Sequence, residues 1–155
     1  MERIASFSVN HLALLPGLYL SRTDECGGVC VSTFDLRMTA PNREPPVDVP
    51  ALHTIEHLGA TFLRNSAHKD KVVYFGPMGC RTGFYLLMFG KLFPADVYAL
   101  VCDMCKFILA FEGDIPGAKA EECGNFSEQN LPMAKFYISR YLSELEEHKR
   151  FVYPQ

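Results

Sequence analysis

The chain has 155 residues, of which 48% are hydrophobic, and its formal net charge is −3. This length suits one domain with its own core, the hydrophobic content excludes a disordered chain, and the charge argues against a broad nucleic-acid-binding surface. No apolar run is long enough to span a bilayer, and the N-terminal stretch lacks the layout of a signal peptide. We therefore expect a cytoplasmic protein that binds neither nucleic acid nor membrane.

The first elements predicted along the chain are two strands, at residues 17–23 and 28–38, joined by the turn-rich "DECGG". The second strand alternates clearly between two faces. One face carries Cys30, Ser32, Phe34, Leu36 and Met38, and the other carries Val29, Val31, Thr33, Asp35 and Arg37. The proline-rich segment "APNREPPVDVP" then predicts a loop, because proline removes a backbone donor and disfavours helix before it.

A helix is predicted from about Pro50 to Asn65, with Asp48 as its cap. Two more strands follow at residues 71–75 and 82–89, with "GPMGC" between them. A second helix begins near Pro94 and ends at Gly113, residues 114–130 form a loop, and a last helix covers about 131–148. This order predicts a single α+β domain, residues 1–155, with an antiparallel sheet packed against helices.

The predicted helix at 50–65 carries a polar sector made of His53, Glu56 and His57. Its histidines lie one turn apart, so both rings can reach one point, while Ile55, Leu58 and Phe62 face the opposite way. Two imidazoles and a carboxylate are costly to bury without a partner, and a divalent metal supplies one. The order His-x-x-Glu-His is that of inverted zincins, in which the glutamate is a base beside the metal. A chance pair of surface histidines is the alternative.

A catalytic metal site needs a third protein ligand. The candidates are the other histidines and the cysteines, and Cys123 stands out in the glycine-flanked loop "EECGN". A thiolate there could reach the histidine helix, although a free thiol is the simpler interpretation of Cys123 alone. Two imidazoles and one thiolate suit zinc, ferrous iron or cobalt.

Cys80, in "GPMGCRTG", occupies a tight, exposed backbone position next to Arg81. A nearby cation lowers a thiol pKa, as a reactive cysteine requires, although an ordinary hairpin cysteine fits the motif too. The remaining cysteines form two pairs. Cys102 and Cys105 are expected to be buried on one helix face, Cys26 and Cys30 flank the Gly-Gly turn, and a four-cysteine zinc site joining the pairs stays open.

Taken together, these motifs resemble the S-ribosylhomocysteine lyase (LuxS) family over nearly the whole chain. The resemblance runs through "SFSVNH", "FDLRMTAPN", "HTIEHLGATFLRN", "GPMGCRTGFYL" and "ECGN", in that order. The sequence departs from the family at Asn10, where an aspartate is common, and at Gly76, where a serine is common.

The resemblance implies a role for each matching position. His53, His57 and Cys123 match the metal ligands, Cys80 and Glu56 match two acid–base residues, and Ser6, His11, Arg37 and Arg64 match substrate-binding positions. It also implies a homodimer with both sites at the subunit interface, where the Ser6–His11 segment and Arg64 reach the partner's site. We expect one divalent metal per subunit, with ferrous iron as the native ion and zinc or cobalt as alternatives.

The reaction that the resemblance implies cleaves S-ribosyl-L-homocysteine into homocysteine and 4,5-dihydroxy-2,3-pentanedione, the precursor of autoinducer-2. It needs a Lewis acid and groups that exchange acid and base roles. Two other functions fit parts of the pattern. An inverzincin-like metallopeptidase would use Glu56 to activate water but would not need Cys80, and a non-catalytic zinc module would close its coordination shell with another cysteine.

Overall fold

The computed structural model describes residues 4–155, except for the side chains of Ala5 and Ser6. Its elements, in chain order, are α1 (Ala5–Ser8), β1 (Gly17–Cys26), β2 (Val29–Arg37), α2 (Val49–Asn65), the short 3₁₀ helix η1 (Lys69–Lys71), β3 (Val72–Pro77), β4 (Gly83–Phe89), α3 (Pro94–Ala110) and α4 (Leu131–His148). The predicted α+β class is confirmed, because one sheet packs against helices in a single compact domain.

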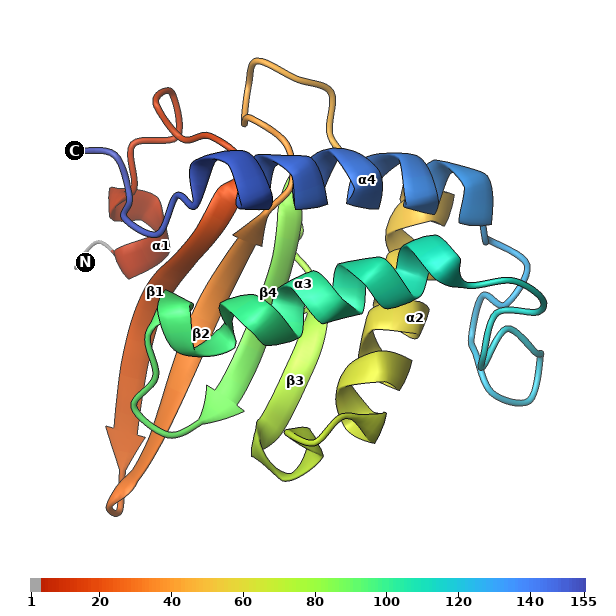
Figure 1. Cartoon of the computed structure of the whole chain (residues 1–155), viewed down its shortest axis with the longest axis horizontal. Helices are drawn as coiled ribbons and strands as arrows, with labels where there is room; N and C mark the ends of the chain where they lie inside the picture. The colour runs from red at the N-terminus through yellow and green to blue at the C-terminus, as the bar shows by residue number, and fades with distance from the viewer. Residues whose placement is uncertain (1–3) are drawn as a thin grey trace.

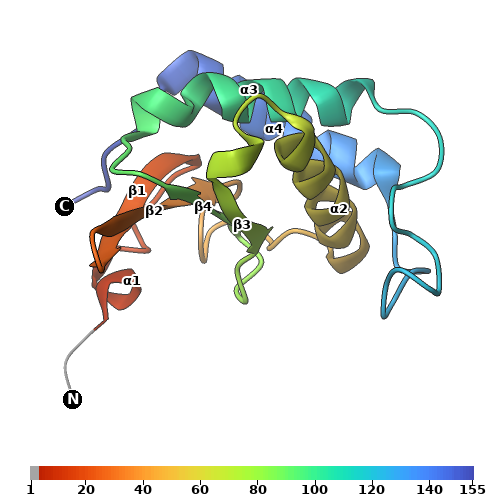
Figure 2. The ribbon, with the colours of Figure 1, turned by 90° about the horizontal axis from the view of Figure 1, so that it is seen from below.

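The four strands form one antiparallel sheet in the order β1-β2-β4-β3. Helices α3 and α4 lie across one face of this sheet, α2 lies beside β3 at the sheet's edge, and α1 lies on the opposite side (Figures 1 and 2). The C-terminal segment after α4 returns toward the end of the molecule that carries α1 and β1 (Figure 1). Residues near the two ends of the chain therefore meet on the same side of the sheet.

Strand β2 separates the core from the second face of the sheet. Phe34 and Leu36, which share one face of the predicted alternation, are fully buried against the helices. Full burial of such a side chain contributes roughly 1.5–3 kcal/mol. On the other face, Asp35 and Arg37 are only 1% and 3% exposed. Burying a carboxylate and a guanidinium is costly unless they are paired, so this face holds a polar cluster as well as a solvent-facing surface.

The predicted helices are present with small shifts at their ends. Asp48 occupies the N-cap position of α2, but its side chain makes no capping hydrogen bond. One of the two usual partners of such a cap is missing, because the second helical residue is Pro50 and has no N–H. Helix α3 ends at Ala110, before Gly113, because Phe111 already adopts an extended backbone. None of the described helices is long and apolar enough to cross a membrane.

Two short elements, α1 and η1, were not predicted, since four and three residues carry no periodicity that could reveal them. Strand β1 is longer than expected and continues to Cys26. The turn that follows contains only Gly27 and Gly28, both with positive φ. Such two-residue turns favour continuous pairing up to the turn itself.

Candidate metal centre and active site

Helix α2 presents its polar sector as its spacing predicts. Ile55 and Leu58 are fully buried in the core. That burial fixes the rotation of the helix, so His53, Glu56 and His57 line a cavity of about 410 Å³ on the other side. Phe75 of β3 and Pro116 and Gly117 of the loop before α4 also line this cavity.

The two imidazole rings are oriented by backbone carbonyls of that loop. The Nδ1 atom of His57 lies 2.7 Å from the carbonyl oxygen of Pro116. The Nδ1 atom of His53 lies 3.0 Å from the carbonyl oxygen of Glu128 and 3.3 Å from the side-chain amide nitrogen of Gln129. A carbonyl can only accept a hydrogen bond, so the shorter contact at each ring requires a proton on Nδ1. Both Nε2 atoms then carry lone pairs.

These Nε2 atoms are only 3.0 Å apart. The Cys123 sulfur lies 3.4 Å from the Nε2 atom of His53. All three ligand atoms lie within 4.8 Å of one another. Two facing lone pairs repel unless a cation lies between them. Tetrahedral zinc-like coordination separates two nitrogens by ~3.3 Å and a nitrogen and a sulfur by ~3.5 Å. The observed spacing therefore fits a divalent metal held by His53, His57 and Cys123.

The loop of residues 111–130 is fastened to α2 beside this centre. The Thr54 hydroxyl donates to the side-chain oxygen of Gln129 and accepts from the backbone N–H of Asn130. Asn130 then caps α4, since its side-chain oxygen accepts from the backbone N–H of Met133. The backbone N–H of Asn125 donates to the Cys123 sulfur at 3.4 Å. One loop thus supplies Cys123 and orients both imidazoles, and outer contacts of this kind tune the ligands of metal sites.

Glu56 lies between the two histidines in sequence and shares their cavity. Its side chain is half-buried, and among the residues that the structure describes it makes no hydrogen bond. Its carboxylate is therefore available to a molecule that enters the metal cavity.

Cys80 lies outside that cavity, at the exposed tip of the turn between β3 and β4. This turn is pinned to the sheet, because the backbone N–H of Met38 donates to the Thr82 carbonyl and that of Val47 to the Arg81 carbonyl. The Cys80 sulfur is 3.1 Å from the Thr82 hydroxyl and 3.9 Å from Nη1 of Arg37. Arg37 also donates to the Thr82 hydroxyl, so guanidinium, hydroxyl and thiol form one chain.

These contacts make Cys80 the acidic thiol of this side of the molecule. Partial burial raises the pKa of Cys80, but hydrogen bonds from the Thr82 hydroxyl and backbone and the charge of Arg37 outweigh burial, so the net pKa is below that of an ordinary thiol. The interpretation of Arg81 as the activating cation was wrong. Arg81 has a left-handed backbone, with φ at 58°, and the cation in contact with the thiol is Arg37, brought from β2 by strand pairing.

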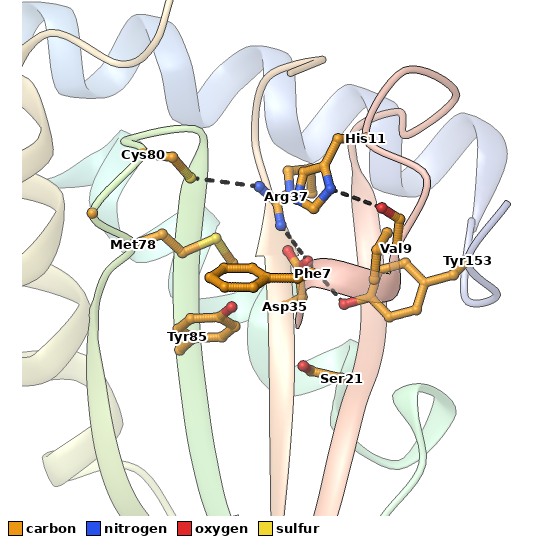
Figure 3. Close-up of a pocket in the computed structure, with 11 residues that line it drawn as sticks. Phe7, Val9, His11, Ser21, Asp35, Arg37, Met78, Cys80, Tyr85 and Tyr153 are labelled. Atoms are coloured by element: carbon orange, nitrogen blue, oxygen red, sulfur yellow. Dashed lines mark hydrogen bonds and ion pairs between the residues drawn. The ribbon is translucent and has the colours of Figure 1, made fainter. Parts of the chain in front are cut away.

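Figure 3 shows that Cys80 and Arg37 line a pocket with His11, Asp35 and Tyr153. Its volume is about 250 Å³, and Phe7, Val9, Ser21, Met78, Gly79 and Tyr85 complete the lining. The Nη2 atom of Arg37 lies 2.6 Å from the Asp35 carboxylate. Burial alone would lower the pKa of Arg37, but the Asp35 charge raises it above its usual value, so the guanidinium stays charged.

The residues matched to substrate binding fall in different places. His11 lies in the Cys80 pocket and also lines an adjoining hollow with Asn42 and Glu44. The side chain of Ser6 lies outside the described part of the structure. Arg64 is exposed on α2 and donates to the carbonyls of Val72 and Val73 at 2.7 and 2.9 Å.

The two departures from the family pattern have different surroundings. Asn10 is exposed. A Cβ atom at Gly76 would lie 1.9 Å from the Tyr74 hydroxyl, so the glycine leaves room for that ring to fold over β3.

The other cysteines do not assemble a metal site. Cys102 and Cys105 are buried in α3, which confirms their predicted place, and Cys26 is exposed at the end of β1. Over residues 4–155, the group of histidine, cysteine or acidic side chains that could hold a metal is His53, His57 and Cys123. The four-cysteine alternative is therefore wrong within this part of the chain, because the two pairs lie on different elements with no convergence.

Fold and site together define a small α+β enzyme with a centre of two histidines and one cysteine and an acidic thiol in a second pocket. The sequence profile of the S-ribosylhomocysteinase (LuxS) family matches residues 4–152. The chain belongs to this family.

Curated relatives agree with this assignment over nearly their whole length. The chain is 52% identical to the S-ribosylhomocysteine lyase of Clostridium beijerinckii, with 99% of each chain covered. It is 51% identical to that of Finegoldia magna, with 100% of each covered. It is 52% identical to that of Phocaeicola vulgatus, with 96% of this chain and 92% of the relative covered.

Proposed function

We propose that the chain is an S-ribosylhomocysteine lyase that releases homocysteine and 4,5-dihydroxy-2,3-pentanedione, the precursor of autoinducer-2. The single observation that carries the proposal is the match to the LuxS family across residues 4–152. The convergence of His53, His57 and Cys123 supports it, because the reaction needs a Lewis acid. An acidic thiol in a second pocket is not required of a metallopeptidase or of a structural zinc module.

The reaction explains why acid–base residues are needed. A carbon–sulfur bond breaks readily when it is β to a carbonyl, so the sugar carbonyl must first move from C1 to C2 and then to C3. Each move takes a proton from one carbon and returns one to the next, and β-elimination then expels homocysteine. A metal held by His53, His57 and Cys123 would supply Lewis-acid stabilisation of negative charge on the sugar oxygens.

The chain's own residues divide the proton transfers. Cys80 as thiolate takes the carbon-bound proton, because Arg37 and Thr82 stabilise its negative charge. The carboxylate of Glu56 moves protons among the sugar oxygens and gives one to the leaving sulfur. We assign substrate binding to four residues, His11, Arg37, Arg64 and Ser6. The two arginines supply permanently charged donors for the anionic groups of the substrate.

We also propose a homodimer in which the active sites lie between subunits. Within one chain, Cys80 and the metal ligands line separate cavities. The outer sheet surface carries exposed apolar side chains, including Val29 at 52% and Phe89 at 44% exposure. Contiguous exposed apolar surface typifies protein interfaces, so we assign the dimer contact to this side of the sheet. A second copy on this surface would bring the Cys80 pocket of one subunit to the metal cavity of the other.

The cellular setting follows from the chemistry of the side chains. None of the six cysteines forms a disulfide, which suits a reducing compartment, and we place the protein in the cytoplasm. Of the metals that suit two imidazoles and a thiolate, we propose ferrous iron as the native ion, with zinc and cobalt as functional substitutes.

The direct test is homocysteine release from S-ribosylhomocysteine, read with a thiol reagent, on protein purified without oxygen. Metal content is measured on the same sample, and a peptide panel tests for peptidase activity. We expect homocysteine release and no peptide cleavage. Metal-loaded, folded protein that releases no homocysteine would contradict the proposal.

A further inference from the structure

A buried polar cluster behind Cys80 contains two residues, Asp35 and Tyr153, to which the reaction described above gives no role. It joins Asp35 and Arg37 of β2 to Tyr153, which lies beyond α4 near the C-terminus. We propose that Asp35 and Tyr153 are positioning residues, which hold the Arg37 guanidinium against Cys80 and thereby make the C-terminal segment part of the active site. This inference rests on the proposed role of Cys80.

The geometry fixes Arg37 from two sides. Its Nη2 atom binds the Asp35 carboxylate at 2.6 Å, while its Nη1 atom donates to Thr82 and faces the Cys80 sulfur at 3.9 Å. Its Nε atom has no partner among the described residues. An arginine side chain has many rotamers, so its guanidinium donates to a chosen partner only when its orientation is fixed. The carboxylate is therefore what determines that Nη1 points at the turn that carries Cys80.

Tyr153 in turn fixes the carboxylate. Its hydroxyl donates to the same oxygen of Asp35 that binds Arg37, at 2.9 Å. Its ring stacks on Tyr19 of β1, with centroids 4.7 Å apart and planes 12° from parallel. Burial and the Asp35 charge raise the pKa of Tyr153 far above its usual value, so the hydroxyl keeps its proton and remains a donor. Figure 3 shows the resulting order from Tyr153 through Asp35 and Arg37 to Cys80.

Several other charged or titratable groups border Cys80 and must be followed in any pH measurement. His11, from the N-terminal segment, and Glu44, from the loop before α2, line a hollow together with Cys80. Tyr85 comes from β4, and Asp35 and Arg37 come from β2. None of these except Asp35 binds Arg37 through a hydrogen bond among the described residues, so the positioning claim concerns Asp35 and Tyr153 alone.

The test measures the pH dependence of Cys80 alkylation by iodoacetamide, followed on the peptide that contains Cys80 by mass spectrometry. Asp35→Asn separates positioning from charge. Loss of a negative charge alone would lower the pKa of Cys80, whereas release of Arg37 should raise it by about 1, which leaves about tenfold less thiolate below the pKa. Tyr153→Phe changes no charge, and we expect about threefold slower alkylation at neutral pH.

Tyr98→Phe is the matched control, because it removes a tyrosine hydroxyl whose 3.5 Å bond to the Leu145 carbonyl lies away from this pocket. It should leave the alkylation profile of Cys80 unchanged. If Tyr153→Phe also leaves it unchanged, or if Asp35→Asn lowers the pKa of Cys80, the inference is wrong. Should Asp35→Asn fail to fold by circular dichroism, Tyr153→Phe decides alone.

Alkylation does not depend on turnover, so the two proposals can fail separately. Slower alkylation with unchanged kcat would support the positioning role and contradict the role of Cys80 as carbon base. Unchanged alkylation with an active enzyme would contradict the positioning role alone.

Discussion

The metal cavity and the Cys80 pocket differ in how far apart in the chain their residues lie. The first takes two imidazoles from adjacent turns of α2, and one loop adds Cys123 and the carbonyls of Pro116 and Glu128. The second gathers Arg37, Cys80 and Tyr153 from segments far apart in the chain. The convergence of the two imidazoles and the Cys123 thiol thus depends on local spacing and one loop, whereas the acidity of the Cys80 thiol depends on the assembled sheet. Changes in one region should leave the chemistry of the other intact.

The largest expected effect comes from removing the loop ligand. Cys123→Ala leaves only two imidazoles, so the protein should lose bound metal and nearly all homocysteine release together. Elemental analysis beside the activity assay measures both. Full metal occupancy in Cys123→Ala would show that this thiolate is not a ligand. Cys26→Ala, at an exposed site away from the cavity, is the control and should keep both metal and activity.

Two substitutions should abolish homocysteine release without changing the metal content of the protein. Cys80→Ala and Glu56→Gln remove the two proposed acid–base groups, neither of which is assigned as a ligand, and loss of such a group costs ~10²–10⁴ in rate. Each group would act in several successive transfers, so we expect the upper end of that range or more. Metal content near that of the unmodified protein in Cys80→Ala confirms the separation between the regions, and its loss there would refute it. Metal loss in Glu56→Gln, which changes the metal cavity itself, would show that this carboxylate supports the metal.

Mixing these two variants should restore activity if the regions meet across subunits. In a hybrid dimer, the intact metal cavity with Glu56 of one chain faces the intact Cys80 of the other. Equal mixing then gives roughly a quarter of the unmodified rate, because half of the dimers are hybrids with one intact site. Absence of rescue, with subunit exchange shown by mass labelling, would place both groups in the same chain's site.

The pH profile of thiol reactivity should differ between regions of the same chain. The acidic limb of Cys80 alkylation should lie at lower pH than for an ordinary thiol, since Thr82 and Arg37 lower its pKa. Cys105, fully buried in α3, has a raised pKa and should not react in the folded protein. The rate of Cys80 alkylation should therefore rise as the pH increases past the lowered pKa of this thiol, and it should be lost at pH values below that pKa. A Cys80 profile above that of a free thiol would contradict the geometry.

The smallest effect is expected at Gly117, whose φ is +74°. A Cβ atom there would lie 3.1 Å from Nδ1 of His57 and would disturb the bond from that ring to Pro116. Gly117→Ala should weaken metal binding, by about tenfold. Gly113→Ala carries the same backbone strain, with φ at +98°, but meets nothing within 4 Å. Equal metal affinities in a chelator competition would show that the contact with His57 is unimportant.

The contrast also explains how far the sequence could predict the molecule. The bounds of α4, the strand at β2 and the convergence of His53 and His57 all follow from local periodicity, and the structure confirms them. The identity of the cation that lowers the pKa of Cys80 does not follow from local periodicity. Arg81 is its neighbour in sequence, but Arg37 is its neighbour in space, through the pairing of β2 with β4. Tyr153 had no local signal, since its partner Asp35 lies 118 residues earlier.

The most direct test of the account is hydrogen exchange at C2 of S-ribosylhomocysteine in deuterated solvent, followed by NMR with metal-loaded Cys80→Ala. The variant should bind substrate and keep its metal but should not exchange this hydrogen, because the group that removes it is gone. Glu56→Gln serves as comparison and should retain part of the exchange while failing to release homocysteine. Exchange by Cys80→Ala at the rate of the unmodified enzyme would show that Cys80 is not the carbon base.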